Sequence, residues 1–174
     1  MGSVRVAAVI QLLTAATFLI MPFLAYRYGD EAQRAAEKDA AAQGFRPELL
    51  EEHGVRFRER GAELLLPLGI ALVLVVLAVL NLAGSDIGRI ATFVFQPLLL
   101  IGGGFVTAGQ VFAVRFVEAG FRKSGEPELQ RIEVRSVADA AVRAFPLWFR
   151  PLVVTRFVLA TAGSALVILL LATA

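Results

Sequence analysis

Four stretches of this chain contain no charged residue, and their lengths constrain its fold more than any other feature. They cover residues 6–26, 64–85, 90–114 and 157–174, and are 21, 22, 25 and 18 residues long. A helix needs about 20 apolar residues to cross roughly 30 Å of hydrocarbon. Only 18% of the chain is charged, against about a quarter in soluble domains. The pattern predicts an all-α integral membrane protein with four transmembrane helices.

The boundaries of these stretches predict the order of the elements along the chain. The fourth stretch is short, but Pro151 suits the first turn of a helix and extends it toward the N-terminus. Asp86 to Arg89 alone separate the second and third stretches, which predicts a tight antiparallel hairpin. We therefore expect one membrane domain over residues 1–174, with helices 6–26, 64–85, 90–114 and 151–174, a loop 27–63 and an amphipathic loop 115–150.

Positive charges predict the orientation. Of the 17 Lys and Arg residues, all but Arg5 and Arg89 lie in or beside the two long loops. The positive-inside rule then places both loops in the cytoplasm and both termini outside. Around the first helix alone the balance is reversed, since Arg5 precedes it while Asp30 and Glu31 follow it. The bias over the whole chain is larger and decides the prediction.

The first loop carries signals for two helices. Gly29 is expected to interrupt the first membrane helix, with Asp30 as the N-cap of an Ala-rich helix 31–43. Gly44 suits the C-terminal end of that helix. A second short helix, 48–53, is expected to end at Gly54.

The second loop carries a basic amphipathic pattern. Pro127 can begin a helix that continues to Phe145, with a stripe of charges spaced every four residues and Trp148 just beyond it. This pattern favours a helix lying on the membrane surface; the alternative is a cytoplasmic helix packed on the first loop. Contacts with anionic lipid head groups are expected for Arg131, Arg135, Arg143, Arg150, Arg156 and Trp148.

The third stretch is unusual because Gln96 and Pro97 are followed by three consecutive glycines. A broken helix here would line a cavity and offer free carbonyl groups. The favoured interpretation is that small residues allow helices to approach closely. The expected packing residues are Gly102, Gly103, Gly104, Ala108, Gly109, Gly163 and Ser164.

Uncharged amides are the candidate polar residues inside the membrane. They are Gln11, Asn81, Gln96 and Gln110. Such groups more often form hydrogen bonds between helices than bind ligands. The alternative interpretation is that they line a polar path along the third helix.

Several chemistries are excluded by composition. The chain has no Cys and a single His, His53, in a hydrophilic segment. This excludes disulfides, thiolate nucleophiles and bis-histidine haem ligation inside the bilayer. We expect no cofactor, metal site or catalytic residue. Acidic residues are interspersed among the basic ones, so a nucleic-acid surface is not expected either.

These observations favour a non-enzymatic accessory or scaffold protein, whose cytoplasmic loops contact a partner or anionic lipid. The first alternative is a small transporter or channel subunit that works as an oligomer, since four helices are few for a complete pathway. The second alternative is a lipid-directed membrane enzyme. The expected partners are the lipid bilayer, a second copy of the chain or another membrane protein.

Overall fold

The computed structural model describes residues 2–58 and 61–174, and within these ranges it is helical with no strand. Contacts between residues divide the chain into two compact units, whereas one membrane domain was predicted. Unit 1 comprises Met1–Met21, Gly61–Val111 and Pro151–Ala174, and unit 2 comprises Pro22–Arg60 and Phe112–Arg150. Each unit is described by itself below.

The prediction of four apolar helices is confirmed. The helices long and apolar enough to cross a membrane are Gly2–Ala42, Leu65–Leu82, Asp86–Val111 and Phe149–Ala172. Their elements are α1 (Gly2–Ala42), η1 (Gly61–Leu64), α3 (Leu65–Leu82), α4 (Asp86–Leu98), η2 (Leu99–Gly103), α5 (Gly104–Val111), α8 (Phe149–Val158), η4 (Leu159–Gly163) and α9 (Ser164–Ala172). η1 is a 3-10 turn, whereas η2 and η4 are π-helical turns.

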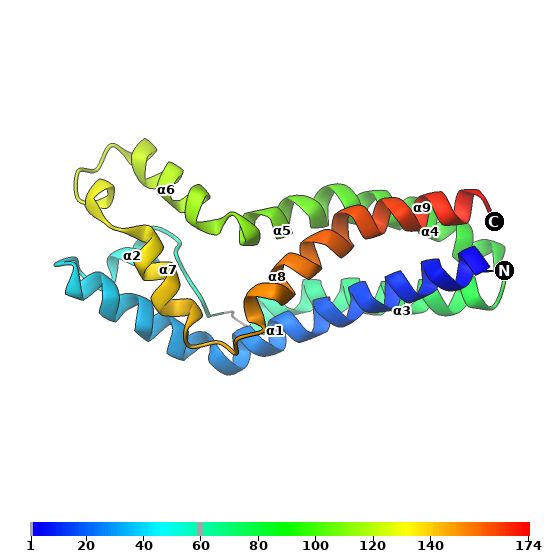
Figure 1. Ribbon diagram of the computed structural model, residues 1–174, viewed down its shortest axis with the longest axis horizontal. Helices are drawn as coiled ribbons and strands as arrows, with labels where there is room; N and C mark the ends of the chain where they lie inside the picture. The colour runs from blue at the N-terminus through cyan, green and yellow to red at the C-terminus, as the bar shows by residue number, and fades with distance from the viewer. Residues whose placement is uncertain (1, 59–60) are drawn as a thin grey trace. The chain divides into compact units, whose positions relative to one another are not determined.

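In unit 1, α4 packs against both α3 and α9, and η2 packs against η4 (Figure 1). One apolar cluster joins α1, α3 and η2 through Ala15, Phe18, Ala71, Leu74 and Leu99. Both chain ends lie at the same end of this bundle as the connection between α3 and α4 (Figure 1). This is the up-and-down order expected for four sequential helices joined as antiparallel neighbours.

The predicted hairpin between the second and third helices is present. Gly84 has a φ of 72°, a left-handed conformation that glycine adopts without strain. The Ser85 hydroxyl then accepts a hydrogen bond from the Gly88 amide at 3.3 Å, so α4 begins at Asp86, four residues earlier than expected. Arg89 consequently lies inside the helix, where its guanidinium donates to the Leu171 carbonyl at 2.6 Å near the end of α9.

The expected interruption at Gly29 is wrong, because α1 continues without a break to Ala42 (Figure 1). A Cβ at residue 29 would lie 2.8 Å from the Phe57 carbonyl oxygen and 2.9 Å from the Arg58 Cα. The glycine therefore allows another backbone segment to approach the helix. The end of α1 is as predicted, with Gly44 at a φ of 88°.

Unit 2 contains the second half of α1 with α2 (Leu49–Glu52), α6 (Ala113–Ser124), η3 (Leu129–Arg131), a 3-10 turn, and α7 (Val134–Val142). Ala32, Ala36 and Ala40 are fully buried and recur at helical spacing along α1. Gln33 is also buried, and its side-chain oxygen accepts from the Phe57 amide at 3.0 Å. The short helix expected at 48–53 is present as α2, and Gly54 follows it with a φ of 75°.

The single helix expected from Pro127 to Phe145 is wrong. Ile132 has an extended conformation, with φ of −68° and ψ of 127°, and separates η3 from α7. At this break the Gln43 side chain accepts from the Glu133 amide at 2.9 Å and donates to the Glu133 carbonyl at 3.5 Å. Because Gln43, 90 positions away, forms hydrogen bonds with the Glu133 N–H and C=O groups, these groups have partners without a continuous helix.

Candidate functional site

Three polar side chains from three helices meet inside unit 1. The Asn81 amide nitrogen donates to the Gln11 oxygen at 3.2 Å and to the Thr92 hydroxyl at 2.9 Å. The Gln11 amide donates to the same hydroxyl at 3.4 Å, and Thr92 donates to the Gly88 carbonyl at 2.8 Å. All three side chains are buried. The cluster therefore joins α1, α3 and α4 through hydrogen bonds shielded from solvent.

Gln96 lies one turn further along α4. Its amide nitrogen donates to the Ser164 hydroxyl of α9 at 3.1 Å, and both residues are fully buried. The Gln96 side-chain oxygen has no hydrogen-bond partner among the described residues. Buried polar atoms in proteins are usually hydrogen-bonded, so this oxygen is an exception among the described residues.

The glycine-rich segment forms a π turn and does not break the helix. Pro97 supplies no amide donor and its ring displaces the carbonyl one turn earlier, and η2 begins two residues after it. Threonine hydroxyls bind carbonyls near both π turns: Thr107 donates to the Gly103 carbonyl and Thr161 to the Phe157 carbonyl, each at 2.7 Å. Such bonds compete with the helical hydrogen-bond ladder and bend helices.

Close packing is observed at three of the expected small residues. An added Cβ at Gly103 would lie 2.7 Å from the Leu99 Cδ1, at Gly104 3.0 Å from the Thr161 Cγ2, and at Gly163 3.2 Å from the Ile10 Cγ2. Gly104 allows α5 to approach η4, and Gly163 allows η4 to approach α1. At Gly103 the close atom belongs to Leu99 of the same turn, and Ala160 of η4 lies at an ordinary contact distance of 3.9 Å. Ser164 contributes through its hydrogen bond to Gln96.

Gly102 and Gly109 do not fit the expected packing role, since a Cβ at either position would meet no described atom within 4 Å. Ala108 is half-buried. Gly88, which was not among the predicted packing residues, does pack closely, since a Cβ there would lie 2.5 Å from the Leu80 Cβ across the α3–α4 hairpin. The sequence signal for this close packing was the position of Gly88 beside the tight turn between α3 and α4.

Arg156 differs from its expected contact with lipid head groups. Its side chain is buried, with the residue only 6% exposed, and its guanidinium lies 4.2 Å from the centre of the Phe18 ring. It also donates to the Gln110 oxygen at 3.4 Å. The guanidinium is thus held by a cation–π contact and an amide within unit 1.

Gln110 accordingly differs from the other amides. All four amides bond to polar groups of other helices, but Gln11, Asn81 and Gln96 are buried, whereas Gln110, which accepts from Arg156, is exposed. The buried amides form hydrogen bonds with one another and with the hydroxyls of Thr92 and Ser164. This arrangement joins helices in the way that the favoured interpretation of these residues expects.

In unit 2, the apolar face of α7 is covered by protein. Val134, Val137, Ala140 and Ala141 are buried, and the Ser136 hydroxyl donates to the Asp39 carboxylate of α1 at 3.1 Å. The helix α7 therefore packs on the first loop, which was the alternative to lying on the membrane surface. A helix whose apolar face is already buried has little hydrophobic surface left to insert into a membrane.

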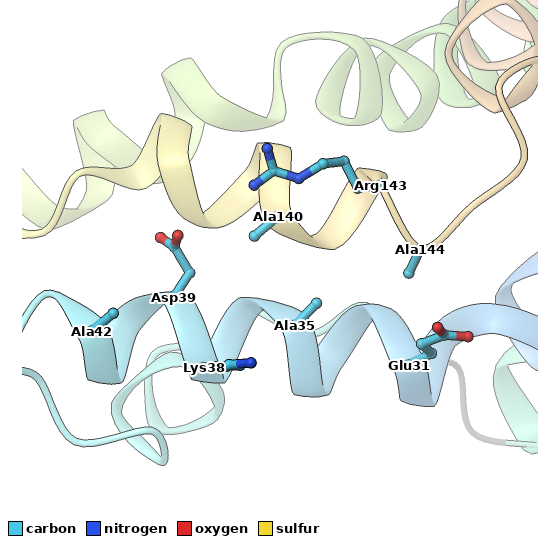
Figure 2. Close-up of a pocket in the computed structure, with 8 residues that line it drawn as sticks. All are labelled: Glu31, Ala35, Lys38, Asp39, Ala42, Ala140, Arg143 and Ala144. Carbon is cyan, nitrogen blue, oxygen red and sulfur yellow. The ribbon is translucent and has the colours of Figure 1, made fainter.

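A groove of about 450 Å³ runs between α7 and the second half of α1 (Figure 2). Small and charged side chains line it together, and Figure 2 shows Asp39 pointing from α1 toward α7. The lining residues are Ala35, Ala42, Ala140 and Ala144 with Glu31, Lys38, Asp39 and Arg143. Asp39 is fixed in position because its two carboxylate oxygens accept from Ser136 and Gln43. The groove therefore presents charges of both signs above short side chains.

The remaining residues expected at the head groups are exposed. Arg131, Arg135, Arg143 and Arg150 lie on the surface, and Trp148 is 50% exposed beside the fully exposed Leu147. Arg150 forms an ion pair with Asp139. Lipid contact for these five residues remains a prediction.

His53 contacts protein groups in unit 2. Its Nδ1 lies 2.9 Å from the Leu49 carbonyl, its Nε2 lies 3.6 Å from the Glu126 carboxylate, and its ring meets Phe121 edge to face. In the described ranges, no group of three or more His, Cys, Asp or Glu side chains is placed to hold a metal ion.

Comparisons of this chain with protein-family models, with curated proteins and with solved structures found no match. Function is therefore inferred from the chain's own residues.

Proposed function

We propose that this chain is a multi-pass membrane protein of the accessory or scaffold type, which binds a partner protein through the groove between α1 and α7. Unit 1 anchors it in the bilayer, with the long loops in the cytoplasm and both termini outside. The groove, with its alanine walls and mixed charges, is the observation that carries the binding role.

Membrane insertion is supported by apolar side chains on the outside of unit 1. Ten of these side chains are each more than 60% exposed: Leu65, Leu66, Leu72, Ile87, Ile90, Val94, Leu98, Ile101, Phe105 and Leu169. Where many large apolar side chains are exposed along the same helices, contact with lipid or another protein is expected. The three helical spans that carry these ten residues, Leu65–Leu82, Asp86–Val111 and Phe149–Ala172, have the length and hydropathy of membrane spans, as does Gly2–Ala42.

The partner that best fits the groove is a helix carrying charges of both signs. Short side chains let two helix backbones come within the 8–10 Å or so of close packing. Lys38 and Arg143 would face acidic residues of that helix, and Glu31 would face a basic one. Each exposed ion pair contributes roughly 0.2–1 kcal/mol, so the charges would select the partner more than hold it.

Site-specific photocrosslinking in cells tests this proposal. A photoreactive amino acid placed at Ala35 or Ala144, inside the groove, should give a discrete protein adduct. The same amino acid at Arg122, which is exposed on α6, is the control. Combining Lys38→Glu with Arg143→Glu should lower the adduct about tenfold, whereas Arg135→Glu, elsewhere on α7, should leave it unchanged. Adducts to lipid alone, or equal losses in both variants, would refute the groove as a protein site.

The transporter alternative has one observation in its favour, which is that the buried Gln96 oxygen has no hydrogen-bond partner in the described part of the chain. A polar path would need the neighbouring amides to face water, and Gln11, Asn81 and Gln96 are buried and bonded to other helices. We therefore place this function second.

A further inference from the structure

Unit 2 contains a second, chemically different cavity. It has a volume of about 170 Å³ and lies between α6, the start of α7 and the segment that follows α2. Its walls include Leu50, Val55, Val117, Phe121, Ile132 and Val137. Arg56 is the one charged side chain among the described residues that line it. Neither the mixed-charge groove nor the buried amides contribute to this cavity.

The volume and walls of this cavity suit a hydrocarbon ligand. A cavity of about 150 Å³ lined by Leu, Ile and Phe stays dry and holds a molecule of six carbons. Polar ligands and peptide backbones need hydrogen-bond partners, which walls of Val, Leu, Ile, Phe and Ala side chains do not offer. The space therefore matches roughly six carbons of a single alkyl chain.

Chain connectivity indicates where such an alkyl chain would come from. Ala113 and Val114 line the cavity, and they follow the candidate span that ends at Val111 by only two and three residues. At 3.8 Å or less per residue, this wall begins within roughly 12 Å of the end of the span. If the span crosses a bilayer, as proposed above, lipid chains are the nearest source of hydrocarbon.

The charge of Arg56 indicates the kind of lipid. Its side chain is exposed, so its positive charge lies at the edge of the apolar space. A guanidinium favours a phosphate or carboxylate group, which it binds in a planar, bidentate manner. A lipid with an anionic head group and an alkyl chain satisfies both parts of the site.

We propose that this cavity binds one acyl chain of an anionic membrane lipid, with Arg56 beside the head group. The inference rests on the proposed membrane insertion of unit 1. It adds a lipid-binding site in unit 2 that is separate from the protein-binding groove.

The test uses the full chain reconstituted into vesicles of phosphatidylcholine that contain phosphatidylglycerol with a diazirine near the end of one acyl chain. After illumination, peptide mapping should find adducts within residues 113–121 and 132–138. Ala138→Phe fills the cavity and should lower these adducts at least tenfold. Ala119→Phe, on α6 but outside the cavity lining, should change them less than twofold. Arg56→Gln should reduce the preference for phosphatidylglycerol over an equally labelled phosphatidylcholine, while Arg34→Gln should not.

Other outcomes overturn the inference. Adducts confined to residues of the candidate spans, or unchanged by Ala138→Phe, would show that no chain enters the cavity. Labelling by a diazirine fatty acid but not by the phospholipid would assign the site to free fatty acids. Should Ala138→Phe fail to fold, Ala113→Phe, at a lining position on α6, adds a large side chain to the same cavity and gives the same comparison. Resistance of the protein to alkaline carbonate extraction is measured in parallel, so that failed insertion is distinguished from an empty cavity.

Discussion

Single residues in unit 1 act by being small or by pairing their polar groups. A Cβ added at any of the glycines 88, 103, 104 and 163 would lie less than 3.3 Å from a neighbouring side-chain atom. The amides of Gln11 and Asn81 serve a different purpose, since they replace water as hydrogen-bond partners in an apolar interior. Both effects act on how the helices meet, and each can be removed by one substitution.

Asn81→Ala should lower stability by about 0.6 kcal/mol, and by no more than roughly 2 kcal/mol, because both donor bonds of the amide are lost. The measurement is thermal unfolding of the purified protein in detergent, followed by circular dichroism. Val79→Ala, at a residue of α3 that is 57% exposed, is the matched control and should have a smaller effect. An Asn81 variant as stable as the wild type would show that the cluster does not hold the helices together.

Gly88→Ala should destabilise the protein by about 1–3 kcal/mol, since the new methyl group would meet the Leu80 Cβ at 2.5 Å and the Leu80 carbonyl carbon at 3.0 Å. Gly102→Ala is the control, because open space surrounds that position in the described structure. It should be neutral or stabilising by up to about 1 kcal/mol through helix propensity. Equal effects of the two substitutions on the unfolding temperature would argue against close packing of the α3–α4 hairpin.

At the scale of elements, sequence reasoning predicts what depends on local composition and misses what depends on distant contacts. Runs without charge predict the four apolar helices, and Gly44 and Gly54 predict two helix ends. The break at Ile132 could not be predicted, because it relies on Gln43 bonding to a backbone 90 residues away. Gly29 was misjudged for the same reason, since its role becomes apparent only once residues 57 and 58 pack against it.

The candidate sites divide in the same way. The buried amides stand out in an apolar sequence, so Gln11, Asn81 and Gln96 were predictable, but their partners Thr92 and Ser164 required the helix register. The groove and the apolar cavity were not predictable, since each combines segments about 60 to 110 residues apart. The sequence therefore identifies individual residues of a site, whereas the contacts among them depend on how distant segments pack.

The burial of α7 leads to a prediction about hydrogen exchange. Val137 is 2% exposed, so Val137→Ser should loosen α7 and speed amide exchange across residues 134–142 in the intact protein. Arg135→Gln, on the exposed face of the same helix, should leave exchange unchanged. Mass spectrometry of the full chain in detergent measures both. Faster exchange in the Arg135 variant alone would indicate that the charged face, and not the apolar one, holds α7.

At the scale of the whole molecule, the chain combines an apolar bundle with a more polar helical unit. Unit 1 carries most of the exposed apolar side chains, and unit 2 contains both the mixed-charge groove and the apolar cavity. In the proposed topology the anchor and the binding surfaces are thus built from different parts of the sequence. The 15 basic residues of the two loops and their flanks predict that those surfaces lie on the cytoplasmic side.

Cysteine labelling tests membrane insertion and orientation most directly, because the natural chain contains no Cys. Single cysteines at Ala41, Ser124 and Ala83, all exposed positions, are treated in intact cells with a membrane-impermeant maleimide. The proposed topology predicts labelling of Ala83→Cys in intact cells, and of Ala41→Cys and Ser124→Cys only after permeabilisation. Labelling of Ala41→Cys and Ser124→Cys in intact cells, with Ala83→Cys protected, would invert the orientation. Recovery of the protein in the soluble fraction would contradict membrane insertion itself.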